Sequence, residues 1–329
     1  MRAIQAREFG GPDVLAATEL PDPVAGPGQV VIGLAAADVI YLDTLLRRGW
    51  GVEMFPRTPP YVPGTGGAGT VLSTGEGVDP GWTGRRVVAS LGSGYAEQVV
   101  AGVEELTELP GKVSFEQAAA VLHDGVTALM LTRLGPPEKD EWVLVTAAAG
   151  GAGSTLVQLA RDAGARVVAA ARGERKLGLA RELGAEHAVD YSEEGWQERV
   201  RDLTGGGARL VFDGAGGGLG RAAFEAVADG GRFVSYGTAD GGFTEVDAEE
   251  AARRRVDAVN ALASGPPDPA DSRAWLAEAL DLVARGRLRP VIGATFPLER
   301  ARDAHVSLEE RRTIGKSLLL VGPDRPAAR

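Results

Sequence analysis

The chain has 329 residues, with 45 acidic and 35 basic side chains and a formal net charge of -10. This length suffices for two domains with cores of their own, and the acidic balance disfavours nonspecific binding to nucleic acid or anionic membranes, because both attract positive surfaces. The absence of cysteine excludes disulfides, thiol catalysis and thiolate metal sites.

The N-terminal residues carry no apolar core of a secretory signal, and no apolar run in the chain approaches the length of a membrane span. We therefore expect a soluble cytoplasmic protein. The three histidines are His123, His187 and His305, and they lack the close spacing that is usual in zinc sites. We expect no bound metal.

The first third of the chain, up to about Gly111, alternates short β-rich segments with glycine and proline. This pattern predicts a barrel-like β module. The expected strands are Val30–Leu34, Gly69–Leu72, Arg86–Ala89 and Ala96–Val100.

From Ser114 the pattern changes to a long helix, Phe115–Leu134, followed by alternating strands and helices through Ala239. Such alternation is typical of an α/β fold with a doubly wound parallel sheet. We expect a helix over Trp275–Arg285 and a last strand over Lys316–Val321. The predicted domains are residues 123–263 for the α/β domain, and 1–122 with 264–329 for the β module.

Within the α/β half, a strand from Trp142 runs into a glycine-rich turn, then a helix over Ser154–Ala163 and a strand over Arg166–Ala171. The turn has the pattern A-x-x-G-x-x-G through Ala147, Gly150 and Gly153. Small residues there let backbone amides approach a pyrophosphate at the helix N-terminus. Three glycines also occur in ordinary tight turns, but the flanking strand, helix and strand favour a dinucleotide site.

The end of the second strand indicates which dinucleotide binds. NAD enzymes place a carboxylate there for the ribose hydroxyls, whereas this strand ends in Ala171 and Arg172, with Arg175 and Lys176 close behind. The cluster suits a 2′-phosphate and predicts NADPH. The alternative is that these basic residues lie on the solvated face of a helix over Glu174–Leu183, which explains Arg175 better than Arg172.

Motifs along nearly the whole chain resemble the medium-chain dehydrogenase/reductase superfamily, and within it the zinc-free NADPH:quinone oxidoreductases related to ζ-crystallin. The motifs that carry this resemblance are Pro63-Gly64, Gly69–Val71, Gly75–Val78, Gly84–Val87, Gly94–Glu97, Gly125–Ala128, Ala147–Gly153, Lys176, Gly184-Ala185, Tyr191, Gly230–Arg232, Gly237, Pro297–Glu299, Ala304-His305 and Gly315-Lys316.

The resemblance implies a GroES-like catalytic domain and a Rossmann domain, with NADPH in the cleft between them and a homodimer formed through the Rossmann domain. It places Gly150, Gly151 and Ala152 on the pyrophosphate, Lys176 and Tyr191 at the 2′-phosphate end, and Thr127 at the nicotinamide. It also assigns to the cofactor site Gly214, Gly237 and Lys316.

The chain departs from the family at three positions of the expected substrate pocket. Ile40 replaces an asparagine, Gly66 an acidic residue and Leu45 a tyrosine. The remaining catalytic candidates are Tyr41, Asp43 and Thr127. Each also has a structural interpretation: Tyr41 can cover the β core, and Asp43 can cap a helix that begins near Thr44.

His123 and Asp124 are a further candidate pair, either for proton transfer or for orientation at a helix bend. The expected reaction is hydride transfer to a small conjugated carbonyl compound such as a quinone. One alternative is an enoyl-thioester reductase, for which Arg47, Arg48 and Arg57 offer a basic path. The other is an NADPH-binding protein without catalysis.

Overall fold

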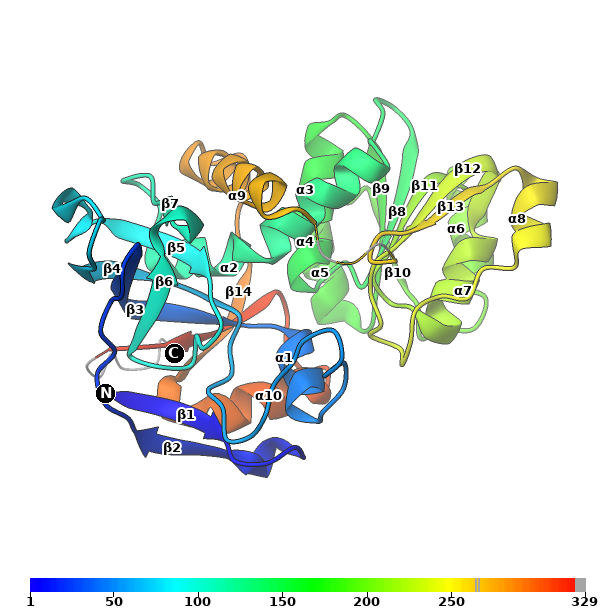
Figure 1. The fold of residues 1–329 in the computed structure, drawn as a ribbon. Helices are drawn as coiled ribbons and strands as arrows, with labels where there is room; N and C mark the ends of the chain where they lie inside the picture. The colour runs from blue at the N-terminus through cyan, green and yellow to red at the C-terminus, as the bar shows by residue number, and fades with distance from the viewer. Residues whose placement is uncertain (264, 266, 323–329) are drawn as a thin grey trace. The chain divides into compact units, whose positions relative to one another are not determined.

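In the computed structural model, which describes residues 1–263, 265 and 267–322, the chain divides into two units (Figure 1). The first contains residues 1–123, 276–286 and the C-terminal segment from Pro290. The second contains residues 124–275 and 287–289. The chain therefore re-enters the first unit at Leu276, whereas the sequence predicted that it re-enters this unit at position 264.

The first unit is built on a seven-stranded sheet with the order β14-β15-β3-β4-β5-β7, in which β6 also pairs with β3. All of these pairs are antiparallel except β14 with β15, and β1 and β2 form a separate hairpin. The strands are β1 (Arg2–Ala6), β2 (Leu15–Glu19), β3 (Gln29–Val39), β4 (Gly66–Thr74), β5 (Arg86–Ser90), β6 (Gln98–Gly102), β7 (Thr107–Glu108), β14 (Ile292–Pro297) and β15 (Lys316–Leu320).

The helices of this unit are α1 (Tyr41–Arg47), α2 (Phe115–Leu122) and α10 (Ala301–Glu309). Ser114 starts α2, because its hydroxyl accepts a hydrogen bond from Gln117 N at 3.1 Å. The prediction of one helix over Phe115–Leu134 is wrong, since α2 ends at Leu122 and α3 (Asp124–Leu134) follows His123. The break falls at a histidine whose ring bonds to a neighbouring strand, and just before Gly125, a poor helix former.

The second unit is a six-stranded parallel sheet with the order β10-β9-β8-β11-β12-β13. Counted from its first strand this order is 3-2-1-4-5-6, the doubly wound arrangement of dinucleotide-binding folds, so the predicted α/β class is confirmed. The strands are β8 (Trp142–Thr146), β9 (Arg166–Ala171), β10 (His187–Asp190), β11 (Ala208–Asp213), β12 (Val227–Ser235) and β13 (Asp257–Asn260).

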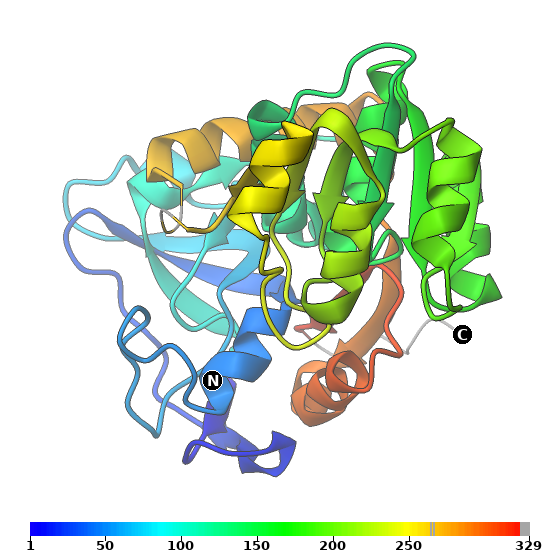
Figure 2. The ribbon, with the colours of Figure 1, turned by 90° about the vertical axis from the view of Figure 1, so that its right-hand side faces the viewer.

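Helices cover both faces of this sheet (Figures 1 and 2). Helices α6 to α8 pack on one face around Phe224 and Phe233, and α4 packs beside α3 on the other. The buried strands are consequently apolar on both sides. The helices are α4 (Gly151–Asp162), α5 (Glu174–Glu182), α6 (Trp196–Thr204), α7 (Gly217–Glu225), α8 (Ala248–Arg254) and α9 (Pro269–Ala284), which runs from this unit into the first. Across the described ranges, no helix has the length and apolar character needed to cross a bilayer.

Candidate cofactor and active site

The glycine turn connects the end of β8 with the start of α4. Ala147 adopts a left-handed conformation with a φ of 49°, and its carbonyl accepts a hydrogen bond from Gly150 N at 2.9 Å. A Cβ atom on Gly153 would overlap that carbonyl oxygen, so this close approach requires glycine. Helix α4 begins at Gly151, three residues before the predicted start. Its first turn therefore carries no side chain larger than the methyl group of Ala152, and its free amides suit an anion.

An acidic side chain lies against this turn. Asp124 is the first residue of α3, and a Cβ atom on Gly151 would overlap its carboxylate. The N-terminus of α4 carries partial positive charge, which attracts a carboxylate as it attracts a phosphate. Asp124 therefore belongs to the immediate surroundings of the glycine turn.

The neighbouring strand ends are joined by a buried carboxylate. Asp213, at the end of β11, accepts a hydrogen bond from the Thr146 hydroxyl at 2.7 Å and another from the Thr244 hydroxyl at 2.5 Å. The Thr146 oxygen in turn accepts bonds from the amides of Gly214 and Ala215, at 3.0 and 3.1 Å. Because β8 and β11 are the strands at which the chain order reverses, this network holds the edge where doubly wound sheets bind their ligands.

Two glycines predicted to line the cofactor groove pack against each other. A Cβ atom on Gly237 would overlap the backbone of Gly214, and one on Gly214 would lie 2.5 Å from the hydroxyl of Tyr236. Burial and the nearby Asp213 raise the pKa of Tyr236, so its phenol stays protonated. Close packing of two loops alone requires glycine at positions 214 and 237, and their contact with a cofactor stays a prediction.

At the end of β9 the structure leaves a positive charge available. Arg172 is exposed, and it forms no hydrogen bond or ion pair with any residue that the structure describes. Lys176 lies half-buried on the first turn of α5. Tyr191 follows β10 and packs edge-on against Trp196, with ring centroids 6.2 Å apart. Of the three residues predicted for the 2′-phosphate, Arg172 and Tyr191 thus follow the ends of β9 and β10, which are neighbours in the sheet, and Lys176 lies on the helix after β9.

The structure also places a carboxylate beside the end of β9, which the sequence did not predict. Asp190, the last residue of β10, is paired in register with Ala171. It accepts hydrogen bonds from Gly173 N at 2.7 Å and from the amide and hydroxyl of Ser192, at 2.9 and 2.5 Å. Burial alone would raise the pKa of Asp190. These hydrogen bonds and the charge of Arg172 have the larger, opposite effect, so the pKa lies below its usual range. Its acceptor positions are thus used to fix its own loop.

In the first unit, the catalytic candidates Tyr41 and Asp43 have different surroundings. Tyr41 is exposed, and Asp43 is 2% exposed. The Asp43 carboxylate accepts bonds from Ile40 N at 3.0 Å and from the Tyr95 hydroxyl at 3.1 Å. The first of these bonds stabilises the start of α1, which begins at Tyr41 and not near Thr44. Burial and the nearby Asp38 charge raise the pKa of Asp43 to about 6.

The Tyr95 hydroxyl continues into a directed chain of hydrogen bonds. Arg47 donates to His305 Nδ1 at 2.9 Å, so the proton of the neutral imidazole is on Nε2, which lies 3.0 Å from the Tyr95 oxygen. Burial and the Arg47 charge lower the pKa of His305 to about 3, which keeps the ring neutral. Tyr95 can then donate only to Asp43.

One of the three arginines of the predicted basic path for a thioester carrier, Arg47, cannot form part of such a path. Arg47 is fully buried, and its guanidinium is used by Glu309, by His305 and by the carbonyl of Gly10. Arg48 also pairs with Glu309, at 3.1 Å. The sequence shows three arginines close together, but it does not show that a later helix, α10, supplies the counter-charge of Arg47 and Arg48 through Glu309.

A second buried cluster joins three elements of this unit. Asp38 on β3 is fully buried, and its Oδ2 atom lies 2.7 Å from His123 Nδ1 and 3.2 Å from Lys316 Nζ on β15. Burial alone would raise the pKa of Asp38, but these two partners hold it well below its usual range. Lys316 was predicted to bind the cofactor, and the structure gives it an ion pair in the core of the unit. His123 pairs with Asp38 and not with Asp124, so the predicted orienting pair is wrong.

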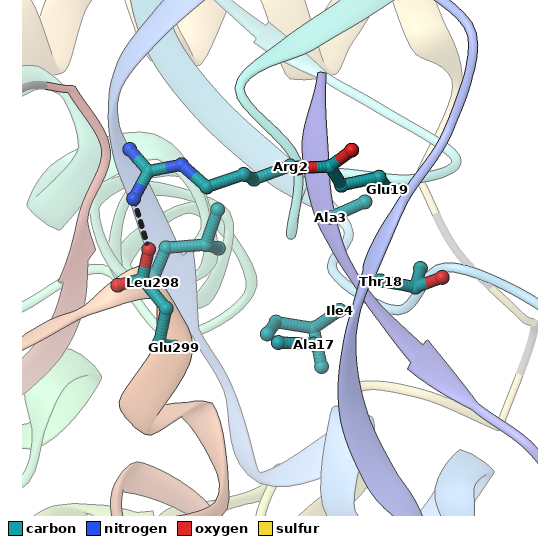
Figure 3. Close-up of a pocket in the computed structure, with 8 residues that line it drawn as sticks. All are labelled: Arg2, Ala3, Ile4, Ala17, Thr18, Glu19, Leu298 and Glu299. Carbon is teal, nitrogen blue, oxygen red and sulfur yellow. Dashed lines mark hydrogen bonds and ion pairs between the residues drawn. The ribbon is translucent and has the colours of Figure 1, made fainter.

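Thr127 lies half-buried on α3, and its role at the nicotinamide stays a prediction. Figure 3 shows a separate surface pocket of about 270 Å³ in the first unit, next to an ion pair of 2.5 Å between Arg2 and Glu299. No predicted site residue lines it. Its lining residues are Arg2, Ala3, Ile4, Ala17, Thr18, Glu19, Leu298 and Glu299.

Within the part of the chain that the structure describes, no three histidine, aspartate or glutamate side chains lie together as a metal site. His123 is bonded to Asp38 and His305 to Tyr95 and Arg47. His187 stacks on Trp142, with ring centroids 5.5 Å apart.

Comparison with known protein families gives two matches. Residues 26–130 match the alcohol dehydrogenase GroES-like domain, and residues 151–284 match the zinc-binding dehydrogenase family. The predicted GroES-like and Rossmann architecture is therefore confirmed.

Individual proteins match over almost the whole chain. A quinone oxidoreductase of Pseudomonas aeruginosa is 33% identical, over 97% of this chain and 99% of its own. A 2-haloacrylate reductase of a Burkholderia species is 31% identical, over 94% and 96%. Among solved structures, a mycobacterial protein complexed with NADPH has a TM-score of 0.87 and 33% identity, over 97% of this chain and 100% of its own.

Proposed function

This chain belongs to the quinone oxidoreductase family of medium-chain dehydrogenases/reductases, and we propose that it is an NADPH-dependent reductase that transfers hydride to quinones or other α,β-unsaturated carbonyl compounds without a metal. One observation carries the proposal. The glycine turn at the head of α4 is followed, on the next strand of the sheet, by an exposed Arg172 where NAD enzymes have a carboxylate. The NADPH complex of the mycobacterial relative supports the same cofactor.

The residues at the turn fit such a cofactor. The amides of Gly150, Gly151 and Ala152 would bind the pyrophosphate, because no side chain in the first turn of α4 obstructs them. Arg172 and Lys176 would neutralise the 2′-phosphate. When bound, NADPH supplies a hydride from C4 of its nicotinamide. The protein has to bind and orient both reactants and to bring a proton.

The substrate class follows from that chemistry. Hydride adds to an electrophilic carbon, so negative charge develops on a carbonyl oxygen of the acceptor, and a nearby donor stabilises it. Tyr41 is an exposed residue whose hydroxyl could serve. Asp43 is already bonded to Ile40 and Tyr95, and it would act by holding α1 in place. The 2-haloacrylate reductase among the relatives supports activated alkenes as acceptors.

Metal independence is proposed from the donor set. The chain has no cysteine. Within the described residues, each of its three histidines contacts different neighbours, so the three do not form a common site. The enoyl-thioester alternative loses one of its three supporting residues, because Arg47 is buried against Glu309. The family also supports a homodimer in the cytoplasm, and size-exclusion chromatography with light scattering would test the dimer.

The experiment is an assay of NADPH oxidation against a panel of quinones, enones and enoyl-CoA esters, with and without EDTA. We expect turnover with quinones or enones and no effect of the chelator. Tight NADPH binding without turnover on any acceptor would favour a non-catalytic NADPH-binding protein. Turnover confined to CoA esters would restore the thioester alternative.

A further inference from the structure

The imidazole of His123 is hydrogen-bonded through one ring nitrogen and not through the other. Its Nδ1 atom lies 2.7 Å from Asp38 Oδ2, and a carboxylate can only accept, so Nδ1 carries a proton. Its Nε2 atom bonds to no residue that the structure describes. The side chain is 28% exposed, whereas Asp38 is fully buried. This is the geometry of a histidine whose free nitrogen can exchange a proton with a ligand.

Gly66 packs closely against this ring. A Cβ atom there would lie 3.0 Å from His123 Cε1 and 3.0 Å from Asp38 Oδ1, and it would overlap Leu122. Asp38 Oδ1 is buried and accepts no hydrogen bond within the described residues. The Cε1 atom of the ring and an unsatisfied carboxylate oxygen therefore both lie beside Gly66, at a position that the family resemblance assigns to the substrate pocket.

The charges around His123 come from three elements. Asp38 lies on β3, Lys316 on β15 and Asp43 on α1, while β4 contributes the uncharged Gly66. The charged residue of β5, Arg86, contacts Phe115 at the other end of α2. Burial lowers the pKa of His123 and Lys316 opposes its charge, but the Asp38 carboxylate raises this pKa above its ordinary value. The Asp38 carboxylate thus favours the protonated form of the ring.

The other titratable groups nearby are less suited to deliver a proton. Tyr95 is buried and donates to Asp43, and His305 is neutral and bonded on both nitrogens. Lys316 is 4% exposed and is paired with Asp38. Along the chain, His123 directly precedes Asp124, whose carboxylate lies against the glycine turn, and stands four residues before Thr127.

We propose that His123 is the catalytic acid of the reduction, and that Asp38 is a positioning residue that holds its ring. The assignment rests on the proposed function. Hydride from NADPH adds to the β-carbon of the acceptor, so the cofactor loses two electrons and the C=C bond opens to an enolate. The enolate takes the proton of His123 Nε2 at its α-carbon. The imidazolium becomes a neutral imidazole that keeps Nδ1–H on Asp38, and solvent returns the proton.

The test compares kcat against pH for the wild type and for His123→Gln, Asp38→Asn, Tyr41→Phe and the control His187→Gln, with circular dichroism and NADPH binding measured on each. In the wild type we expect kcat to fall as pH rises through the pKa of His123. His123→Gln should lose about 10²–10⁴-fold in kcat and lose this pH dependence, with NADPH affinity unchanged. Asp38→Asn should shift the fall to lower pH, because the charge that holds the proton is gone. His187→Gln and Tyr41→Phe should keep the wild-type pH profile.

Three outcomes would overturn the assignment in distinguishable ways. If His123→Gln turns over at the wild-type rate with the wild-type pH profile, the proton comes from elsewhere and the reductase function stands. Loss of the profile in Tyr41→Phe alone would likewise overturn the assignment and would identify Tyr41 as the donor. If the wild type binds NADPH but reduces no acceptor, the proposed function fails and the role of His123 fails with it.

Discussion

The hydroxyl of Thr146 donates a 2.7 Å hydrogen bond to the carboxylate of Asp213, and so joins the ends of β8 and β11. Both side chains are fully buried. The bond lies where the strand order of the second unit reverses, directly before the glycine turn on one strand and Gly214 on the other. A single hydroxyl thus fixes the relative position of two loops that we assign to the cofactor.

Thr146→Val removes this hydroxyl without changing the shape of the side chain. The amides of Gly214 and Ala215 and the Asp213 carboxylate would each lose a partner in a buried place. We expect the free energy of unfolding to fall by about 1–3 kcal/mol, measured by urea denaturation. Thr146→Ser keeps the hydroxyl and is the control. Equal stability of the valine and serine variants would show that the network contributes nothing.

Alanine substitutions distinguish the roles of two glycines of the turn. Gly150 has an ordinary extended backbone, and an added Cβ would meet only the Ala147 oxygen, at 3.3 Å. An added Cβ on Gly153 would overlap that same oxygen. We expect Gly150→Ala to fold normally and to weaken NADPH binding at least tenfold, because a methyl group enters the phosphate site. Gly153→Ala should lose about 1–3 kcal/mol of stability.

Calorimetric titration and urea unfolding on both variants would check this pair. If Gly150→Ala kept the NADPH affinity of the wild type, the amides of the turn would not approach the pyrophosphate.

The predicted 2′-phosphate site gives a third test. Arg172→Ala should weaken NADPH by about 10–150-fold, since a charge-assisted hydrogen bond contributes about 1.5–3 kcal/mol. NADH should be affected little. Arg175→Ala is the matched control, because Arg175 lies on the first turn of α5, close to Arg172 in the chain. An equal loss for the two nucleotides in Arg172→Ala would contradict the assignment.

The raised pKa of Asp43 predicts a pH dependence of stability. This pKa is about 6 in the folded chain and about 3.9 in an unfolded one, so between these values the folded state binds the extra proton. The contribution to stability is complete below about pH 4 and is lost as pH rises through about 6, by about 3 kcal/mol in all.

Urea unfolding of the wild type and Asp43→Asn across that pH range would measure this contribution. The asparagine keeps an acceptor for Tyr95 and Ile40 but has no proton to lose, so we expect the difference between the two proteins to change in favour of the variant as pH rises. A constant difference would mean that Asp43 is already ionised at pH 4.

The second unit was largely predictable, because its succession of strands and helices follows from short stretches of the sequence. The alternation of strands and helices indicated the α/β class, and the expected strand over Arg166–Ala171 is the observed β9. The start of α4 was placed too late because glycine has a low helix propensity, whereas Gly151 and Gly153 lie in its first turn, where no intrahelical donor bond is needed.

The buried clusters of the first unit were not predictable from one sequence. Asp38 and His123 are 85 residues apart in the chain, and nothing local pairs them. One signal was present: an aspartate within the apolar segment Gln29–Val39 needs a partner if that segment is buried. The sequence does not say which of the distant cations supplies it.

The central claim is that the turn from Ala147 to Gly153 binds a dinucleotide and that Arg172 and Lys176 select the phosphorylated form. Isothermal titration of the wild type with NADPH and with NADH, on protein shown by circular dichroism to be folded, tests it most directly. We predict saturable binding of one NADPH per chain, at least tenfold tighter than NADH. No saturable heat with either nucleotide, or tighter binding of NADH, would contradict it.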